Sequence, residues 1–310
     1  MYELKRIVVS LDLTALDEEV VRYTSVMAEI MDADTIYFLH VAASLNLPDT
    51  LSEEYGAALA PVDETIKHET RATVDKHFSN RDTTDIHVDV LEGKPTETVL
   101  KYAKRKEADL IVLGKPNQSV RPRLHLGKIA ELSSCSVLFV PKGADIRLDE
   151  VGVALDFSDQ SFRAVQQALR IADEGNQRMP PVRVYGLHVY RVPNGFSKTG
   201  KSYEEFAQIM EHNAREEEKK FFKKHKLAFD RCDVRYRLSR DNEVHDELEA
   251  FAEEKNLDML VVGSQGRTAA ASLLLGSVSE QMLHYENHIP LFVVKEKGGN
   301  LGFFEALFKL

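Results

Sequence analysis

The sequence predicts an α/β protein made of two repeated domains, each an open parallel sheet with helices on both faces. Three observations support this prediction. Short apolar runs typical of strands alternate with segments whose apolar residues recur at helical spacing. The same series begins again near the middle of the chain. The length of 310 residues suits two domains that each bury a core of their own.

The first copy opens with a strand, a helix and a second strand. The run LKRIVVSLD at 4–12 is typical of a short buried strand that ends in a carboxylate. Thr14 and Asp17 then have the spacing of a helix capping box, with Asp in place of Glu. The expected helix carries an apolar stripe: Val20, Tyr23, Thr24 and Met27. TIYFLHV at 35–41 is the second expected strand.

The segment from about 42 to 80 is polar and contains Pro48 and Pro61, which predicts a loop followed by a helix that begins near Asp63. The alternating run IHVDVL at 86–91 predicts a strand with one covered face. A turn at Gly93 leads into a helix with its own stripe: Thr96, Val99, Leu100 and Ala103. A strand, a short helix and a final strand are expected at 109–113, 128–133 and 137–140.

The second copy repeats this order. VGVALD at 151–156 matches the first strand, so Asp156 takes the place of Asp12, and Ser158 predicts a helix N-cap. The matching helix stripe is Val165, Ala168, Leu169 and Ala172. Three later segments also match: GLHV at 186–189 with FLHV at 38–41, DMLVVG at 258–263 with DLIVLG at 109–114, and LFVVK at 291–295 with VLFVPK at 137–142. We therefore expect domains at 1–143 and 144–297, followed by a tail at 298–310.

The segment GSQGRTAAASLLLGSVS at 263–279 joins an expected strand to an expected helix. Its three glycines would let backbone N–H groups approach an anion, and the helix start would add further donors. The pattern predicts a phosphate cradle, although glycines also collect in turns for purely structural reasons. Ligands of open α/β sheets bind beyond the carboxyl ends of the strands. Asp156, Val189 and Gly263 follow or end three such strands, which favours a nucleotide site.

The complete pattern Gly-x2-Gly-x9-Gly-Ser, together with VALDFSD at 153–159 and GLHV at 186–189, resembles the universal stress protein family. The resemblance covers residues 4–296 and implies two five-stranded sheets of order 3-2-1-4-5. It also implies ATP binding in the second domain, with Asp156 on the nucleoside, Ala154 beside the adenine and the backbone of Val189 hydrogen-bonded to the ligand. Ribose and phosphates would be held by Gly263, Gly266, Gly276, Ser277, Val278 and Ser279, and Arg267 is a further candidate phosphate partner.

The first copy departs from this signature. When Gly114 is aligned with Gly263, Asn117 stands where the second copy has Gly266, and Lys128 stands where it has Ser277. Of these later signature positions only Gly127 matches, with Gly276. A long cation near the phosphate positions would either bind an anion or fill the site. We expect the first domain to bind no ATP and to serve structure or partner recognition.

Composition and charge disfavour several classes of function. The net charge of −10 disfavours nonspecific nucleic-acid binding, although a local basic patch would escape this argument. No apolar run approaches the roughly 20 residues that span a bilayer, and no signal-peptide layout is present, so we expect a cytoplasmic protein. Cys135 and Cys232 are interpreted as reduced thiols, with a redox role as the alternative.

No arrangement of residues points to fast catalysis. His284 and His288 are four residues apart, but Pro290 predicts that a helix ends there, which disfavours a metal site. His40 and His188 end equivalent strands and are expected to be hydrogen-bonded structural residues. The run EEEKKFFKKHK at 216–226 predicts a solvated helix face, with a docking patch for acidic partners as the alternative.

The tail LGFFEALFKL has apolar residues at helical spacing but is too short for a stable free helix. It is expected to dock on its own chain or a dimer mate, on a protein partner, or on a membrane surface. The function predicted for the whole chain is a regulatory module that binds ATP, with AMP, ADP or a cyclic dinucleotide as other ligands and Mg²⁺ as an accompanying ion. The alternatives are a slow ATP hydrolase and a nucleotide-free scaffold, and both a monomer and a homodimer are compatible with the sequence.

Overall fold

The computed structural model describes residues 3–46, 61–79, 83–117, 124–175, 181–240, 243–265, 275–285 and 288–298. The chain forms two compact units, which meet in sequence between Ile146 and Arg147. Among the described residues, no helix is both long and apolar enough to cross a membrane.

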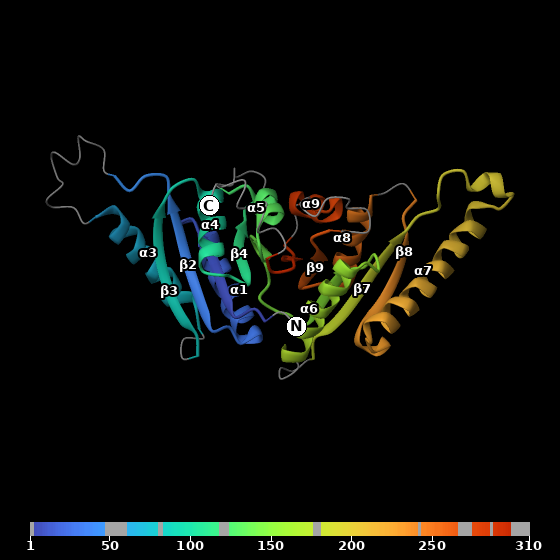
Figure 1. The fold of residues 1–310 in the computed structure, drawn as a ribbon, viewed down its shortest axis with the longest axis horizontal. Coiled ribbons are helices and arrows are strands. Elements are labelled where there is room, and N and C mark those ends of the chain that lie inside the picture. The colour runs from blue at the N-terminus through green and yellow to red at the C-terminus, as the bar shows by residue number, and fades with distance from the viewer. Residues whose placement is uncertain are drawn as a thin grey trace. The chain divides into compact units, whose positions relative to one another are not determined.

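The first unit contains a parallel five-stranded sheet of order β3-β2-β1-β4-β5. Its elements, blue to green in Figure 1, are β1 Arg6–Leu11, α1 Leu16–Met31, β2 Thr35–Ala42, α3 Val62–His77, β3 Asp85–Glu92, α4 Pro95–Arg105, β4 Leu110–Lys115, α5 Leu126–Leu132 and β5 Ser136–Pro141. The expected stripes of α1 and α4 are buried against the sheet, so both are confirmed. Their spacing of three and four residues places the stripe on one face of each helix.

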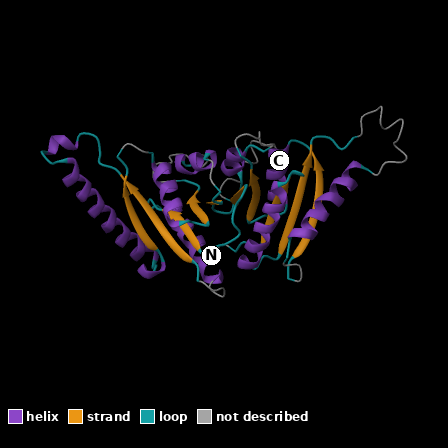
Figure 2. Ribbon diagram, turned by 180° about the vertical axis from the view of Figure 1, so that it is seen from behind, coloured by secondary structure: helices purple, strands orange, loops and turns teal. Residues whose placement is uncertain are grey.

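The second unit repeats the fold with the order β8-β7-β6-β9-β10, again all parallel. Its elements are β6 Glu150–Ala154, α6 Asp159–Gly175, β7 Arg183–Tyr190, the 3-10 turn η1 Phe196–Thr199, α7 Tyr203–His225, the 3-10 turn η2 Phe229–Arg231, β8 Asp233–Leu238, α8 Val244–Lys255, β9 Met259–Gly263, α9 Ser277–His284 and β10 Leu291–Val294. In each unit the strands lie between layers of helix (Figure 2). The predicted fold class and strand order are confirmed.

Ser158 caps α6 as expected, because its Oγ accepts a hydrogen bond from the N–H of Ser161 at 3.1 Å. The capping box predicted at Thr14 and Asp17 is wrong. Helix α1 begins at Leu16 and has no side-chain cap. The carboxylate of Asp17 instead accepts hydrogen bonds from the backbone N–H groups of Asp12 and Leu13, at 3.2 and 2.8 Å. The sequence spacing was right for a cap, but the acceptor serves the turn that precedes the helix.

The charged run at 216–226 is only partly a solvated face. Lys219 and Lys220 pair with Glu216 and Glu217, at 2.7 and 3.3 Å. Phe221 and Phe222, however, are buried, and the ring of Phe221 packs 5.7 Å from the ring of Phe157. The last turns of α7 therefore belong to the core of the second unit.

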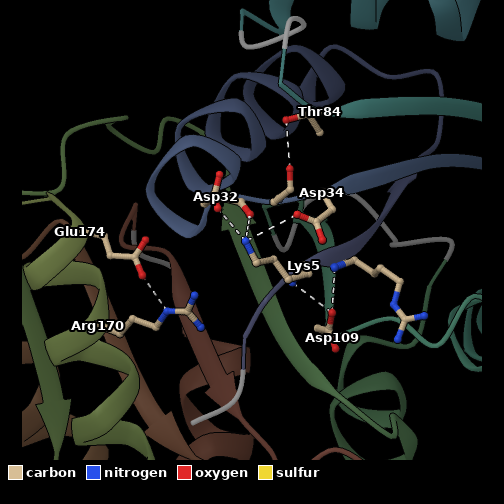
Figure 3. Close-up of polar contacts among 9 residues, drawn as sticks. Lys5, Asp32, Asp34, Thr84, Asp109, Arg170 and Glu174 are labelled. Atoms are coloured by element: carbon tan, nitrogen blue, oxygen red, sulfur yellow. Dashed lines mark hydrogen bonds and ion pairs between the residues drawn. The ribbon is translucent and has the colours of Figure 1, made fainter.

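An aspartate fixes the amino end of the central strand in each unit. Asp109 Oδ2 accepts hydrogen bonds from the N–H groups of Lys5 and Arg6, at 3.1 and 2.8 Å (Figure 3). Asp258 Oδ2 accepts from Asp149 and Glu150, at 2.8 and 2.9 Å. The two matched segments that begin with these aspartates thus share a structural role.

The first unit also includes residues from far along the chain. Lys297 Nζ donates to the carbonyl oxygen of Glu107 at 3.0 Å and forms an ion pair with Asp109. The N–H of Gly298 donates to the carbonyl oxygen of Ser134 at 2.8 Å. Residues that follow β10 therefore complete the amino-terminal edge of the first sheet.

Candidate functional site

The candidate site lies at the carboxyl edge of the second sheet, where three neighbouring strands end. On β6, Ala154 is the last residue and Asp156 follows two residues later. On the neighbouring strands, Val189 lies one residue before the end of β7, and Gly263 is the last residue of β9. Since β6 pairs with both β7 and β9, these positions share one edge of the sheet. Gly266 and Arg267, also predicted for the site, lie outside the described residues.

Two hydrogen bonds bring the start of α9 to the end of β9. The N–H of Gly276 donates to the carbonyl oxygen of Ser264, and the Oγ of Ser279 donates to the carbonyl oxygen of Gly263, both at 2.8 Å. Gly276 and Ser279 are therefore held beside the last residues of β9. Ser277, at the first position of α9, is exposed, whereas Ser279 is buried.

Helix α9 has no side-chain cap. The first turn of any helix carries N–H groups that the helix itself cannot satisfy, and its dipole makes this end positive. The N–H groups of Ser277, Val278 and Ser279 are therefore suited to an anion. Because the hydroxyl of Ser279 is already bonded to Gly263, Ser277 offers the accessible hydroxyl.

The turn after β6 holds Asp156 in place. Its Oδ1 accepts a hydrogen bond from the N–H of Ser158 at 2.9 Å. Phe157 between them has a φ of 61°, which is uncommon for a bulky side chain and costs strain. The ring of Phe157 stacks on His188 with centroids 4.5 Å apart, and His188 Nδ1 donates to the carbonyl oxygen of Leu155 at 2.9 Å.

Gln160 is a site residue that the sequence reasoning missed. It lies in the first turn of α6 and packs against the end of β9, so that a Cβ added to Gly263 would stand 3.1 Å from its carbonyl carbon and oxygen. The close approach of helix and strand therefore favours glycine at 263, because a Cβ there would press on the backbone of Gln160. The repeat held a usable signal, because Leu16, the counterpart of Gln160, also contacts the matching glycine, although it meets Gly114 with its side chain and not with its backbone.

The corresponding edge of the first unit carries different chemistry. Asp12 Oδ1 accepts a hydrogen bond from Thr14 Oγ at 2.8 Å, and Leu13 has a φ of 60°, like Phe157. Asp17 is buried beside this turn, and burial raises the pKa of its carboxyl to about 7. Lys128 is exposed in α5, and Gly127 has open space around the position of a Cβ. In this unit the last signature glycine has no packing role.

The remaining candidate chemistry is structural in character. His40 Nδ1 donates to the carbonyl oxygen of Leu11 at 3.0 Å, which repeats the contact of His188, and His288 Nδ1 donates to the carbonyl oxygen of Lys142 at 2.7 Å. Cys135 and Cys232 are buried and unbridged, and burial raises the pKa of Cys232 to about 12. Within the described ranges, no three His, Cys, Asp or Glu side chains are placed to hold a metal ion.

Comparisons with known proteins agree with this architecture. The model of the universal stress protein family matches residues 3–141 and again residues 148–295. Universal stress protein MJ0531 of Methanocaldococcus jannaschii is 30% identical over 146 residues, which are 44% of this chain and 82% of that protein.

Two solved structures share the fold over nearly the whole chain. A functionally unknown protein, PA1789 from Pseudomonas aeruginosa PAO1, has a TM-score of 0.64 at 13% identity and covers 99% of this chain and 98% of its own. A universal stress protein from Archaeoglobus fulgidus has a TM-score of 0.59 at 18% identity, with 95% and 100% covered. The chain belongs to the universal stress protein family and carries the family's domain twice in tandem.

Proposed function

We propose that the second unit binds an adenine nucleotide, ATP in the first place, and that the protein acts as a regulatory binding module. The observation that carries this proposal is the meeting of three strand ends and the uncapped start of α9 at one edge of the sheet. In an open parallel sheet this edge is the usual place for a nucleotide. We also propose that residues 144–297 form the nucleotide-binding domain and residues 1–143 its degenerate partner, with 298–310 as a separate tail.

The residues present fit such a ligand. Val189 can offer backbone groups to an adenine edge, with Ala154 beside the base, and the carboxylate of Asp156 can accept from the nucleoside. The N–H groups and hydroxyl at the start of α9 suit phosphate oxygens. Gly266 and Arg267 complete the proposed cradle. The nucleotide would supply the phosphate charge that the uncapped helix start favours.

The first unit is proposed not to bind ATP. Lys128 stands at the position of Ser277, and its long, exposed side chain would fill the place that phosphates need there. In the first turn of α1, Leu16 stands where α6 has Gln160, which makes this position more apolar. The next residue, Asp17, stands where α6 has Ser161, which makes that position more acidic.

Other members of the family were solved in complex with cAMP and with dAMP. These ligands are facts about those proteins, whose likeness to this chain is weak. We propose ATP as the physiological ligand, with AMP, ADP or a cyclic dinucleotide as alternatives. We also propose Mg²⁺ as an accompanying ion, a cytoplasmic location, a homodimer and a protein partner for the tail.

The test is the nucleotide that the freshly purified protein releases on denaturation, followed by titration of the emptied protein with ATP. A substitution at Gly263 is a poor probe, because any Cβ there disturbs the packing on Gln160. Ser277→Glu is sharper. An exposed carboxylate at the first helical position favours α9 but repels phosphate, so we expect an unchanged fold and at least about tenfold weaker ATP binding.

Ser277→Ala is the matched control and should lose only about twofold to fivefold, because the backbone donors remain. About one nucleotide per chain, with affinity lost in Ser277→Glu, would support the proposal. No release and no uptake at millimolar ATP would favour a scaffold. Phosphate release over many turnovers, weakened in step with binding in Ser277→Glu, would favour a slow hydrolase.

A further inference from the structure

The side chain of Gln160 carries a buried oxygen that nothing in the described chain satisfies. Its Cβ lies 3.2 Å from the position of a Cβ on Gly263, so the side chain starts directly over the end of β9. Its Oε1 is buried and has no hydrogen-bond partner among the residues that the structure describes. Buried acceptors are paired in the great majority of cases, because an unpaired one keeps the full cost of desolvation. The site therefore contains an acceptor that lacks a donor.

The repeat shows that the fold does not require an amide at this position. Leu16 occupies the same place in the first unit, in the first turn of the helix that follows the central strand. Its Cδ2 would lie 2.7 Å from a Cβ on Gly114, the glycine that corresponds to Gly263. An apolar side chain thus fills this packing position without any unpaired atom. The amide appears in the unit that has the complete glycine signature.

The order of the strands decides which ligand group could donate. At neutral pH an adenine nucleotide has two kinds of donor, the exocyclic amine of the base and the ribose hydroxyls, since the phosphates only accept. In the proposed site the base lies at Val189 on β7, and β6 separates β7 from β9. Neighbouring strands are about 4.8 Å apart, so the ends of β7 and β9 are about 10 Å apart. The exocyclic amine is then too far away to donate to Gln160. The ribose joins the base to the phosphates, so its hydroxyls are within reach of Gln160.

We propose that Gln160 accepts a hydrogen bond from a ribose hydroxyl and makes the second unit select ribonucleotides over their deoxy counterparts. This inference rests on the proposed adenine-nucleotide site. It gives the buried oxygen its donor and explains why the two repeats differ at this position. A site built to pair a hydroxyl rejects an analogue that lacks it, because the acceptor is then left unpaired.

The test is calorimetric titration of the full chain with ATP, 2′-deoxy-ATP and 3′-deoxy-ATP. The wild-type protein should bind ATP about tenfold more tightly than one of the two deoxy nucleotides. Gln160→Leu, which installs the residue of the first unit, should bind ATP about tenfold more weakly and show no preference. Gln160→Glu keeps an acceptor and should keep the preference even though its charge weakens all three ligands. Gln208→Leu, on the exposed side of α7, should change nothing.

The outcomes separate this inference from the function on which it rests. If the wild-type protein binds no adenine nucleotide, the proposed site itself fails. If it binds ATP and Gln160→Leu keeps the preference, or weakens all three nucleotides equally, Gln160 does not read the ribose. The Tm of ligand-free Gln160→Leu should equal or exceed that of the wild type. A lower Tm with the preference intact would assign the amide a structural role.

Discussion

The buried carboxyl of Asp17 should make the first unit less stable as the pH rises through neutrality. Its side chain is 6% exposed and accepts two backbone N–H groups of the turn at Asp12 and Leu13. Burial, chiefly, raises its pKa from 3.8 to about 7, and the neighbouring Asp12 carboxylate adds to the shift. A group whose pKa is higher in the folded state contributes its full stability below the unfolded pKa. That contribution is lost as the pH rises through about 7.

The size of the effect follows from the shift. Roughly three pH units at about 1.4 kcal/mol each correspond to about 4 kcal/mol of stability lost between acid and alkaline pH. Asp17→Ser installs the residue of the second unit, Ser161, and removes the titration. It also removes hydrogen bonds worth about 1–2 kcal/mol. Near about pH 5 the wild type has already lost roughly 1.6 kcal/mol, so the variant should be about as stable as the wild type there and about 2–3 kcal/mol more stable near about pH 9.

Urea unfolding followed by far-ultraviolet circular dichroism measures this difference in the full chain. Asp63→Ser is the control, because Asp63 is an exposed carboxylate in the first turn of α3. It should shift stability by less than about 0.5 kcal/mol, and equally at both pH values. A wild-type advantage over Asp17→Ser that is the same at both pH values would refute the reasoning, because Asp17 would then be ionised throughout.

Three further predictions concern packing, backbone capping and a partly buried histidine. Gly263→Ala should destabilise the protein by about 1–3 kcal/mol in urea unfolding, because the backbone of Gln160 must move. Gly127→Ala is the control: it has open space in α5 and should be neutral or stabilising by up to about 1 kcal/mol. Equal effects of the two substitutions on the free energy of unfolding would contradict the packing argument. Asp258→Ala removes the acceptor of two backbone N–H groups and should lower the free energy of unfolding by about 2–4 kcal/mol. It should also make hydrogen exchange faster at the amides of Asp149 and Glu150. Unchanged exchange at these two amides would mean that the carboxylate does not hold the strand. Burial lowers the pKa of His225, whose ring stacks on Phe162 with centroids 3.7 Å apart. Its contribution to stability is therefore present above the unfolded pKa and is lost as the pH falls through the lower folded pKa. His225→Phe should reduce this loss of stability in acid, and an identical pH profile of Tm in both proteins would contradict the prediction.

Periodicity predicted much of the fold because core helices must bury one face. The stripe Val165, Ala168, Leu169 and Ala172 is buried, like its counterpart in α1. The repeat likewise placed an aspartate at the end of each central strand, and the structure has Asp12 one residue beyond β1 and Asp156 two residues beyond β6. What failed were short-range assignments in which one side chain has several backbone partners within reach. Asp17 has the spacing of a capping residue, yet its carboxylate accepts hydrogen bonds from the N–H groups of Asp12 and Leu13, and α1 has no side-chain cap.

The site was predictable in outline and not in detail. Strand ends are fixed by sheet topology, so Asp156, Val189 and Gly263 could be placed on one edge from the sequence. The role of Ser279 could not, because its hydroxyl turns toward the carbonyl of Gly263 instead of the cradle. Gln160 was missed because a polar residue in the first turn of a helix is ordinarily solvated. Its burial depends on how closely α6 approaches β9.

The return of residues 296–298 to the first unit affects the order in which the protein can be made. During synthesis the whole first repeat leaves the ribosome before Lys297 does, so Asp109 and Ser134 must wait for partners that arrive after β10. A fragment that stops at the boundary between the repeats would lack these contacts permanently. The first repeat is earliest in the chain, yet its amino-terminal edge is among the last parts of the described structure to be finished.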